Sequence, residues 1–563
     1  MKDSTETDAI SDSLNLLSTL LDSELPSVRN FKGKWSLARV KLTQLQAHLT
    51  DFSAEFPNAS TTNPLSLHLL HSISQTLNDA VLLSKTCQPE TLPNGKLKTQ
   101  SDLDSLLTTL DRHVTDCDIL FRSGLLLENT ISVSVSKREA IRSESRNLIT
   151  RLQIGSPESK ASAMDSLLGL LQEDDKNVTI ALAQGVVPVL VRLLDSSPSD
   201  TKEKTVAAIS KISTVESAKS VLLAEGLLLL NHLLRVLDSG SGFAIEKACI
   251  ALRALSLTKE NARAIGSRGG ISSLLEICQA GTPGAQASAA AVLRNLAAFE
   301  EIRVNFVEEN AVVVLIALAS SGTAVARENA VGCLSNLTNS DSLEEAEGLL
   351  NLRVMVVKEG GVECLKNYWD SGNQIQSLEV AVEMLRHLAE SGPIGEVLVG
   401  EGFVQRLVGV LNCEVLAVRI AAARAVYALG LNSVRARKEM GELGCVLGLI
   451  KMLDGKGVEE KEASAMALSV LLMHPANRRI FRKDERGVVS AVHLLNPSLQ
   501  GLDKKYPVSL LALLVHSKSC RKQMVAAGAC VHTQKLVEMD VPGSKKLLES
   551  LGRGKIWGVF ARP

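Results

Sequence analysis

The sequence contains few aromatic residues and almost no net charge. Phe, Trp and Tyr make up 3% of its 563 residues, although 45% of the residues are hydrophobic. β-Sheets favour aromatic and β-branched side chains, so a core built mainly from Leu, Ala and Val indicates packed helices. The 61 Lys and Arg residues nearly balance the 62 Asp and Glu residues, for a formal net charge of -1. This balance argues against a protein that holds nucleic acid or anionic lipid by bulk electrostatics.

The sequence also lacks paired cysteines and long hydrophobic runs. Its ten cysteines are scattered singly, without a Cys-x-x-Cys motif, which is typical of buried thiols in a reducing compartment. The most apolar stretch, residues 220–237, is interrupted by Glu225, Asn231, His232 and Arg235. A membrane span needs about 20 mostly apolar residues. The N-terminus is polar and acidic, so we expect no signal peptide, no integral membrane association, and a cytoplasmic or nuclear location.

Patterns that carry catalysis or bind metals are missing as well. The histidines are dispersed, and none has the i, i+4 partner and the Glu of a zinc-protease helix. The glycine-rich string at residues 266–270 lies at a recurring helix break and does not follow a strand, so it does not predict a phosphate loop. The basic run at residues 478–483 coincides with a repeated helix, which favours a structural role. We therefore expect a protein that is not an enzyme and needs no cofactor or metal.

A small residue followed by a Val- and Leu-rich run recurs through most of the chain. The positions of the small residue or its substitute are Gly185, Gly226, Gly269, Asn310, Gly360, Gly402, Gly444, Arg486 and Gly528. Successive copies are 41 to 43 residues apart, except for one interval of 50. A period in this range is the signature of tandem structural repeats. We interpret the glycine as the break between a short first helix and the next helix.

Two further landmarks keep the same spacing. A basic side chain lies about seven residues before the small residue in most copies: Lys219, Arg263, Arg303, Arg353, Arg437, Arg479 and Arg521. An Ala- and Leu-rich run comes before it, as at residues 289–297 and 328–337. Apolar residues at i, i+3, i+4 and i+7 in these runs indicate amphipathic helices. The sequence therefore predicts an all-α chain.

These residues resemble the armadillo repeat, a unit of three helices. The copy at residues 259–298 matches its pattern best, with Gly269, Gly270 and Asn295 in place. The resemblance implies a right-handed armadillo-repeat superhelix, an α-solenoid, over residues 136–553 with about nine or ten repeats. An acidic insertion near residues 338–348 is interpreted as a surface loop, and residues 554–563 as a C-terminal tail.

Residues 1–135 lack the period and are predicted to form an N-terminal helical bundle. Helical patterns cover residues 11–21, 34–52, 65–87 and 103–121. This order resembles the N-terminal helical region of plant U-box/armadillo proteins, which are ubiquitin ligases. Their activity resides in a U-box that begins with a Cys-Pro-Ile type motif, and no Cys-Pro-Ile occurs in this sequence. The resemblance therefore implies no ligase activity.

The armadillo resemblance also implies a binding site. In that family the third helices line a concave groove for extended partner segments, and an Asn near the end of each binds the partner's backbone, because its amide both donates and accepts. The equivalent positions here include Asn295, Asn336 and His387. Receptors of the importin-α type place Trp one turn earlier, where this sequence has Ala291 and Gly332. Nuclear cargo import is therefore disfavoured.

Basic residues on or near the predicted third helices favour an acidic extended ligand. The candidate groove residues are Lys204, Lys211, Lys247, Arg294, Asn295, Asn336, Arg386, His387 and Arg424. We predict a non-catalytic scaffold or adaptor that binds partner proteins, as extended peptide segments, through this groove and does not bind nucleic acid. The alternative is a substrate-recognition subunit of a ubiquitin-ligase assembly without its own U-box, with a partner from the ubiquitin pathway.

Overall fold

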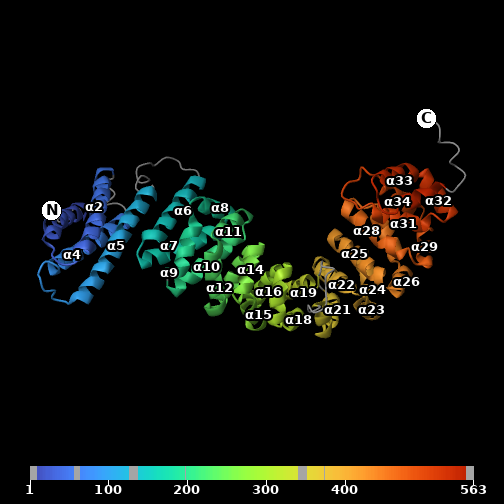
Figure 1. The fold of residues 1–563 in the computed structure, drawn as a ribbon, viewed down its shortest axis with the longest axis horizontal. Helices are drawn as coiled ribbons and strands as arrows, with labels where there is room; N and C mark the ends of the chain where they lie inside the picture. Colours follow the sequence, from blue (N-terminus) through green and yellow to red (C-terminus); the bar gives the residue numbers. More distant parts are fainter. Residues whose placement is uncertain are drawn as a thin grey trace, which may run out of the picture. The chain divides into compact units, whose positions relative to one another are not determined.

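The computed structural model describes residues 9–55, 64–123, 125, 137–196, 198–339, 352–372 and 374–552. Every regular element in these ranges is a helix, so the predicted all-α fold is confirmed (Figure 1). The predicted tail at residues 554–563 and residues 340–348 of the predicted insertion lie outside the described residues. Contacts along the chain divide it into two compact units, residues 1–255 and 256–563.

The first unit begins with the predicted helical bundle. It contains α1 (Ala9–Thr19), α2 (Lys32–Glu55), α4 (Pro64–Thr86) and α5 (Lys96–Ser123). Their apolar stripes share one core, in which Leu42, Leu77 and Leu110 are fully buried. Side-chain contacts at a spacing of seven residues, two helical turns, join α2 to α5 and show that these helices run parallel. The pairs are Lys34 with Asp104, Lys41 with Asp111 and His48 with Asp118.

The rest of the first unit consists of repeated helices. Two helices come first, α6 (Lys137–Ile154) and α7 (Pro157–Glu173). One triplet follows as α8 (Asp175–Ala183), α9 (Val186–Ser196) and α10 (Ser199–Ser213). The next is α11 (Lys219–Ala224), α12 (Gly226–Ser239) and α13 (Gly242–Leu255).

The second unit continues the same triplet of a short first helix, a second helix and a third helix. Its first triplets are α14 (Lys259–Ser267), α15 (Gly270–Ala280) and α16 (Pro283–Ala297); α17 (Arg303–Glu308), α18 (Ala311–Ser321) and α19 (Ala324–Thr338); and α20 (Leu352–Lys358), α21 (Gly361–Asp370) and α22 (Glu379–Ala389). Then come α23 (Gly392–Gly400), α24 (Phe403–Leu411) and α25 (Leu416–Asn432), and α26 (Val434–Glu442), α27 (Cys445–Leu453) and α28 (Val458–Leu471). The last are α29 (Pro475–Phe481), α30 (Glu485–His493) and α31 (Lys505–Leu514), and α32 (Lys518–Ala526), α33 (Ala529–Glu538) and α34 (Ser544–Gly552).

A left-handed residue separates the first and second helix of nearly every triplet. Positive φ angles occur at Gly185, Gly226, Gly269, Asn310, Gly360, Gly402, Gly444 and Gly528, which confirms the predicted helix break. Only glycine, and to a lesser degree Asn, adopts this conformation at low cost. The copy at Arg486 has a side-chain N-cap in place of the left-handed residue. There Asp484 caps α30, and its Oδ1 accepts hydrogen bonds from the backbone N–H groups of Arg486 at 2.9 Å and Gly487 at 3.1 Å.

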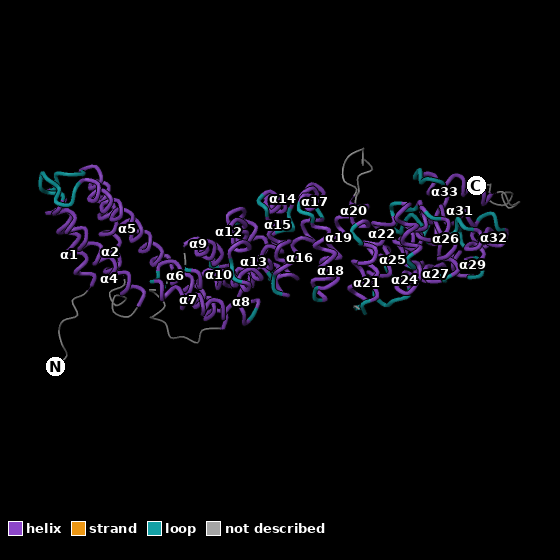
Figure 2. Tube along the Cα trace, turned by 90° about the horizontal axis from the view of Figure 1, so that it is seen from below, coloured by secondary structure: helices purple, strands orange, loops and turns teal. Residues whose placement is uncertain are grey.

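Consecutive third helices pack most closely against each other. The helices α16, α19, α22, α25, α28 and α31 form a continuous row in the second unit (Figure 1). Figure 2 shows the second helices α18, α21, α24 and α27 along one edge of this row. Small residues such as Ala290, Ala330 and Ala422 are fully buried in the third helices. They allow neighbouring backbones to approach, which explains the ring-poor, Ala-rich composition.

In two copies the recurring basic residue donates a hydrogen bond to the last carbonyl group of the preceding third helix. Arg303 Nε donates to the carbonyl of Ala297 at 3.2 Å, and Arg353 Nε donates to the carbonyl of Thr338 at 2.9 Å. These carbonyls lie at helix C-termini, which lack intrahelical donors and carry partial negative charge. The basic side chain that recurs about seven residues before the small residue therefore has a structural role at Arg303 and Arg353.

Two substitutions in neighbouring repeats test the left-handed turn. Gly444 has φ +95°, and a Cβ added there would meet nothing within 4 Å, so Gly444→Ala should destabilise the protein by about 1–2 kcal/mol through backbone conformation alone. Gly409 lies inside α24, also with nothing within 4 Å of an added Cβ, so Gly409→Ala should stabilise the protein by about 0.5–1 kcal/mol. Midpoints of urea unfolding measure both. Shifts in the same direction would contradict the role of the turn.

Candidate functional site

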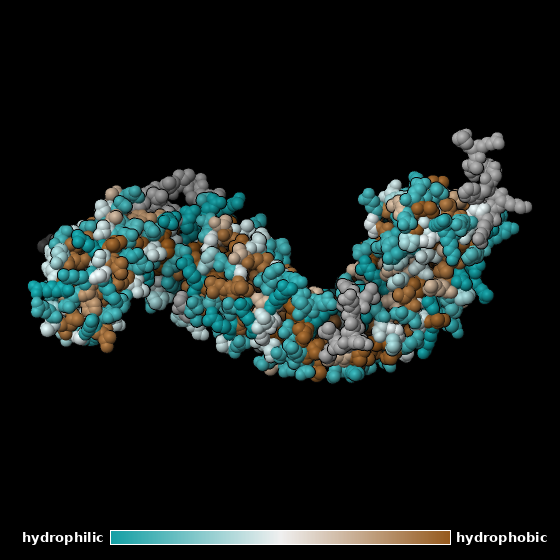
Figure 3. Space-filling model, in the orientation of Figure 1, coloured by the Kyte–Doolittle hydropathy of each residue, from teal (hydrophilic) through white to brown (hydrophobic). Residues whose placement is uncertain are grey.

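Each third helix from α16 to α31 exposes one narrow stripe. On α25, Arg424 and Tyr427 are partly exposed while the other residues from Ile420 to Gly430 are buried, and Leu431 is exposed. On α22 the stripe consists of Glu379, Glu383 and Arg386, and Glu390 follows directly after the helix. We define the groove face as these stripes on α16, α19, α22, α25, α28 and α31. The row of third helices lies on the inner side of the arc formed by the second unit, and Figure 3 shows that this side is hollowed.

The two predicted asparagines lie on the groove face and hydrogen-bond to neighbouring protein groups. Asn295 Nδ2 donates to Ser256 Oγ at 3.0 Å, and Asn336 Nδ2 donates to the carbonyl of Arg294 at 2.8 Å. Each partner belongs to the segment one repeat earlier. These amides therefore link successive third-helix segments, a structural role in addition to the predicted contact with a ligand.

Arg294 lies across Gly332 of the next third helix. A Cβ added at Gly332 would stand 2.6 Å from Arg294 Nε, so a larger residue would require this arginine side chain to move. Receptors of the importin-α type carry Trp at the position of Gly332. In this protein the space is instead occupied by an arginine from the preceding repeat.

The predicted lysines of the first unit are paired with carboxylates. Lys204 Nζ lies 2.7 Å from Asp165 and 3.2 Å from Asp200. The hydrogen bonds to these two carboxylates also raise the pKa of Lys204. The other two pairs are Lys211 with Asp175 at 2.7 Å and Lys247 with Glu246 at 3.4 Å. Such pairing reduces the field that these cations offer to an acidic ligand.

The predicted arginines on α22 and α25 are paired in the same way. Arg424 Nη2 lies 2.9 Å from Glu459. Arg386 is paired with Glu383 at 2.7 Å and with Glu390 at 3.1 Å. These stretches of the groove face therefore present alternating charges and not a basic surface.

His387 is buried between α19 and α22 with 3% of its surface exposed. Its Nδ1 lies 2.9 Å from the carbonyl oxygen of Ser335. Burial, with a smaller contribution from the charge of Arg386, lowers the pKa of His387 to about 3. The ring is therefore neutral near pH 7 and packs beneath the groove face, where a ligand does not reach it.

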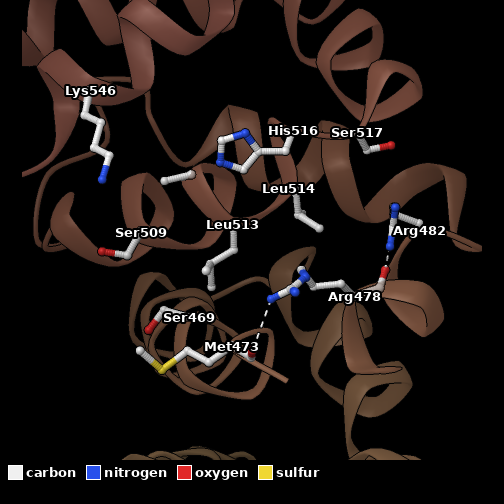
Figure 4. Close-up of a pocket in the computed structure, with 11 residues that line it drawn as sticks. Ser469, Met473, Arg478, Arg482, Ser509, Leu513, Leu514, His516, Ser517 and Lys546 are labelled. Atoms are coloured by element: carbon white, nitrogen blue, oxygen red, sulfur yellow. Dashed lines mark hydrogen bonds between the residues drawn. The ribbon is translucent and has the colours of Figure 1, made fainter. Parts of the chain in front are cut away.

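A hollow at the C-terminal end of the groove face was missed by sequence reasoning. It has a volume of about 600 Å³ and is lined by residues of the last three repeats, among them Met473, Arg478, Arg482, Leu513, His516 and Lys546 (Figure 4). We call it the terminal hollow. The basic run at residues 478–483 was the available signal, because two of its arginines line the hollow. The sequence alone does not bring Lys546 beside them.

Metal-ligating groups and cysteine reactivity in the described residues bear on catalysis. The described residues contain no group of three or more His, Cys, Asp or Glu side chains placed to hold a metal ion. Burial raises the pKa of the Cys278 and Cys445 thiols to about 12, so these cysteines are protonated and poor nucleophiles at neutral pH. Across these same ranges no single helix is long and apolar enough to cross a membrane. Two bent helix pairs, within residues 175–195 and 216–239, reach the required length and apolar composition only when their two helices are taken together.

The buried imidazole predicts a pH dependence of stability. The pKa of His387 is about 3 in the folded protein, against 6.5 for an ordinary histidine, so on acidification the unfolded chain takes up a proton first. Stability should fall by at most about 1.4 kcal/mol per pH unit from this group between pH 6.5 and 3. His387→Gln should reduce that slope in urea unfolding measured from about pH 7.5 to about pH 4.5. Values at the upper end, where the imidazole is neutral in both states, supply the baseline, and an unchanged slope would contradict the assignment.

Comparison with protein families gives two matches. Residues 11–125 match a domain of unknown function (DUF7032), which covers the helical bundle. Residues 174–214 match the armadillo/beta-catenin-like repeat and span α8, α9 and α10. No curated protein matches the sequence.

Solved structures resemble the chain to different degrees. An engineered protein from the Northeast Structural Genomics Consortium is 24% identical, with a TM-score of 0.61, over 72% of this chain and 98% of its own. A designed armadillo repeat protein is 21% identical over 43% of this chain and 98% of its own, with a TM-score of 0.38. Another, in complex with the peptide (KR)4, is 18% identical over the same shares, with a TM-score of 0.37. Residues 174–214 thus match one armadillo/beta-catenin-like repeat, and helix triplets of the same kind recur along both units, most of them with a left-handed turn between the first two helices.

Proposed function

We propose that this protein is a non-catalytic scaffold or adaptor that binds extended segments of partner proteins on the groove face. The observation that carries the proposal is the unbroken row of third helices from α16 to α31, each with one exposed stripe. A row of parallel stripes offers contacts at regular intervals, which suits an extended chain better than a compact small molecule.

The C-terminal half of the groove face has the side chains that peptide-binding surfaces use. Tyr427 on α25 and Tyr506 on α31 form an edge-to-face pair with ring centroids 6.0 Å apart. Leu431 is 49% exposed and Met473 is 52% exposed. Aromatic residues and Met are enriched at protein interfaces because they bury a large apolar area with few rotatable bonds or with adaptable shape. These residues give the proposed site an apolar anchor among its charges.

Two leucines of nearly equal exposure test which side of the solenoid binds. Leu431 lies on the groove face, whereas Leu447 lies on the second helix α27 and is 48% exposed. Partners are first identified by affinity capture on the full chain and then purified. Leu431→Glu should weaken binding of a purified partner by roughly tenfold, because a charge then replaces an apolar contact. Isothermal titration calorimetry measures the affinity.

The control variant Leu447→Glu should change affinity by less than about twofold, a small effect next to roughly tenfold. Equal losses in the two variants, or a loss only in Leu447→Glu, would show that the groove face is not the binding surface.

The runner-up function is a substrate-recognition subunit of a ubiquitin-ligase assembly without its own U-box. Assays of ubiquitin chain formation with the purified partners distinguish it from a scaffold of another pathway. Chain formation that needs both a partner and an intact Leu431 would favour the runner-up. Its absence with every partner would favour the scaffold.

A further inference from the structure

The terminal hollow has cations on opposite sides and apolar side chains between them. Arg478 is half-buried, and Arg482 and Lys546 are exposed. Figure 4 shows Lys546 on one side, Arg482 on the other, and Leu513 and His516 between them. The cations come from α29, the residue that follows it, and α34, which belong to the last two repeats and are brought together by the stacking of the solenoid.

These cations have no carboxylate partner among the described residues. None of the residues that line the hollow is Asp or Glu. Arg478 Nη1 donates instead to the backbone carbonyls of Leu472 at 2.8 Å and Met473 at 3.1 Å, and Arg482 Nε donates to the carbonyl of Arg478 at 2.9 Å. These acceptors carry no formal charge, so no carboxylate balances the three cations within the described residues.

The groove face two and three repeats before α31 is different. There Arg424 is paired with Glu459, and Arg386 is paired with Glu383 and Glu390. The terminal hollow therefore differs in charge pairing from these two stretches of the groove face. Residues 474–552 contain 13 Lys and Arg residues and 6 Asp and Glu residues, a formal net charge of +7 in a chain whose total is -1.

Neutral donors in the hollow complement the cations. Ser517 lies directly before the first residue of the nine-residue helix α32, and Ser509 lies on α31. A hydroxyl group donates one hydrogen bond, and the backbone N–H groups at a helix N-terminus favour an anion. Leu513, Leu514 and Met473 supply apolar area beside these donors.

We propose that the terminal hollow binds an acidic segment of a partner protein, one that carries several Asp or Glu residues around an apolar side chain. Its carboxylates pair with Arg478, Arg482 and Lys546, and its apolar side chain contacts Leu513 and Met473. The volume of about 600 Å³ exceeds that of one carboxylate, and cations on opposite sides require charges spaced along a chain. This inference rests on the proposed function and names the partner chemistry at one end of the groove face.

Labelled synthetic peptides test this chemistry on the full chain. The peptides are (Glu-Leu)4, (Gln-Leu)4 and (Lys-Leu)4, and fluorescence anisotropy measures their affinity at two salt concentrations. We expect (Glu-Leu)4 to bind at least roughly tenfold tighter than (Gln-Leu)4, with weaker binding at high salt, because screening reduces charge attraction. Equal affinity for the acidic and neutral peptides would overturn the proposal.

A matched pair of charge-reversal variants locates the site. Arg482→Glu with Lys546→Glu changes two exposed lining residues and leaves the structural contacts of Arg478 Nη1 intact. Lys451→Glu with Lys535→Glu changes two exposed residues of the second helices α27 and α33 and alters the net charge by the same amount. The first double variant should lose at least roughly tenfold in affinity for (Glu-Leu)4, and the second should lose little, because the pairs differ in position and not in charge. Equal losses in the two would overturn the site assignment.

The same variants separate this proposal from its alternatives. A single-stranded oligonucleotide that binds tighter than (Glu-Leu)4 and depends on Arg482 and Lys546 would assign the hollow to nucleic acid and overturn the proposal. If (Glu-Leu)4 does not bind while Leu431→Glu still lowers the affinity for a purified partner, the acidic-segment site at the terminal hollow is contradicted. The proposed function of the groove face then stands. If (Glu-Leu)4 binds at the hollow but Leu431→Glu does not weaken any partner, the proposed binding of partners along the groove face is contradicted. The acidic-segment site at the terminal hollow is then still supported.

Discussion

Burial of small side chains between consecutive third helices is the constraint on which the rest of this structure depends. A single triplet of about 42 residues has too little core to cover its own apolar faces, so each repeat is stable only against its neighbours. Alanines such as Ala290, Ala330 and Ala422 keep the third helices close together. This close packing leaves one exposed stripe on each third helix from α16 to α31. The binding face is therefore a consequence of how the core is built.

The polar groups near the row of third helices show how that packing is completed. Asn295 and Asn336 donate to groups of the preceding repeat, and Arg303 and Arg353 donate to carbonyls at third-helix C-termini. A buried or half-buried polar group costs free energy when it has no partner, so these bonds accompany the burial of apolar area. Side chains that the repeat pattern predicts to bind a ligand can thus stabilise the packing of successive repeats.

Charge pairing distinguishes one part of the groove face from another. In α22 and α25 the exposed arginines have carboxylate neighbours, whereas Arg482 and Lys546 at the terminal hollow have none among the described residues. Two surfaces of similar composition therefore present different fields to a partner. The near-zero charge of the whole chain hides this difference, because it averages the basic last repeats with acidic segments elsewhere.

The sequence by itself determined the helical fold, the period and the turn between the first two helices of each repeat. These follow from local rules, because a glycine at a fixed position and a 3.6-residue apolar pattern act within a few residues. Only the tertiary structure decided which candidate residues face a partner. His387 is buried against Ser335, and Arg294 lies across Gly332. Arg482 and Lys546 line opposite sides of one hollow. Such contacts join residues about 40 or more positions apart, and their geometry depends on the stacking of whole repeats, which no single repeat specifies.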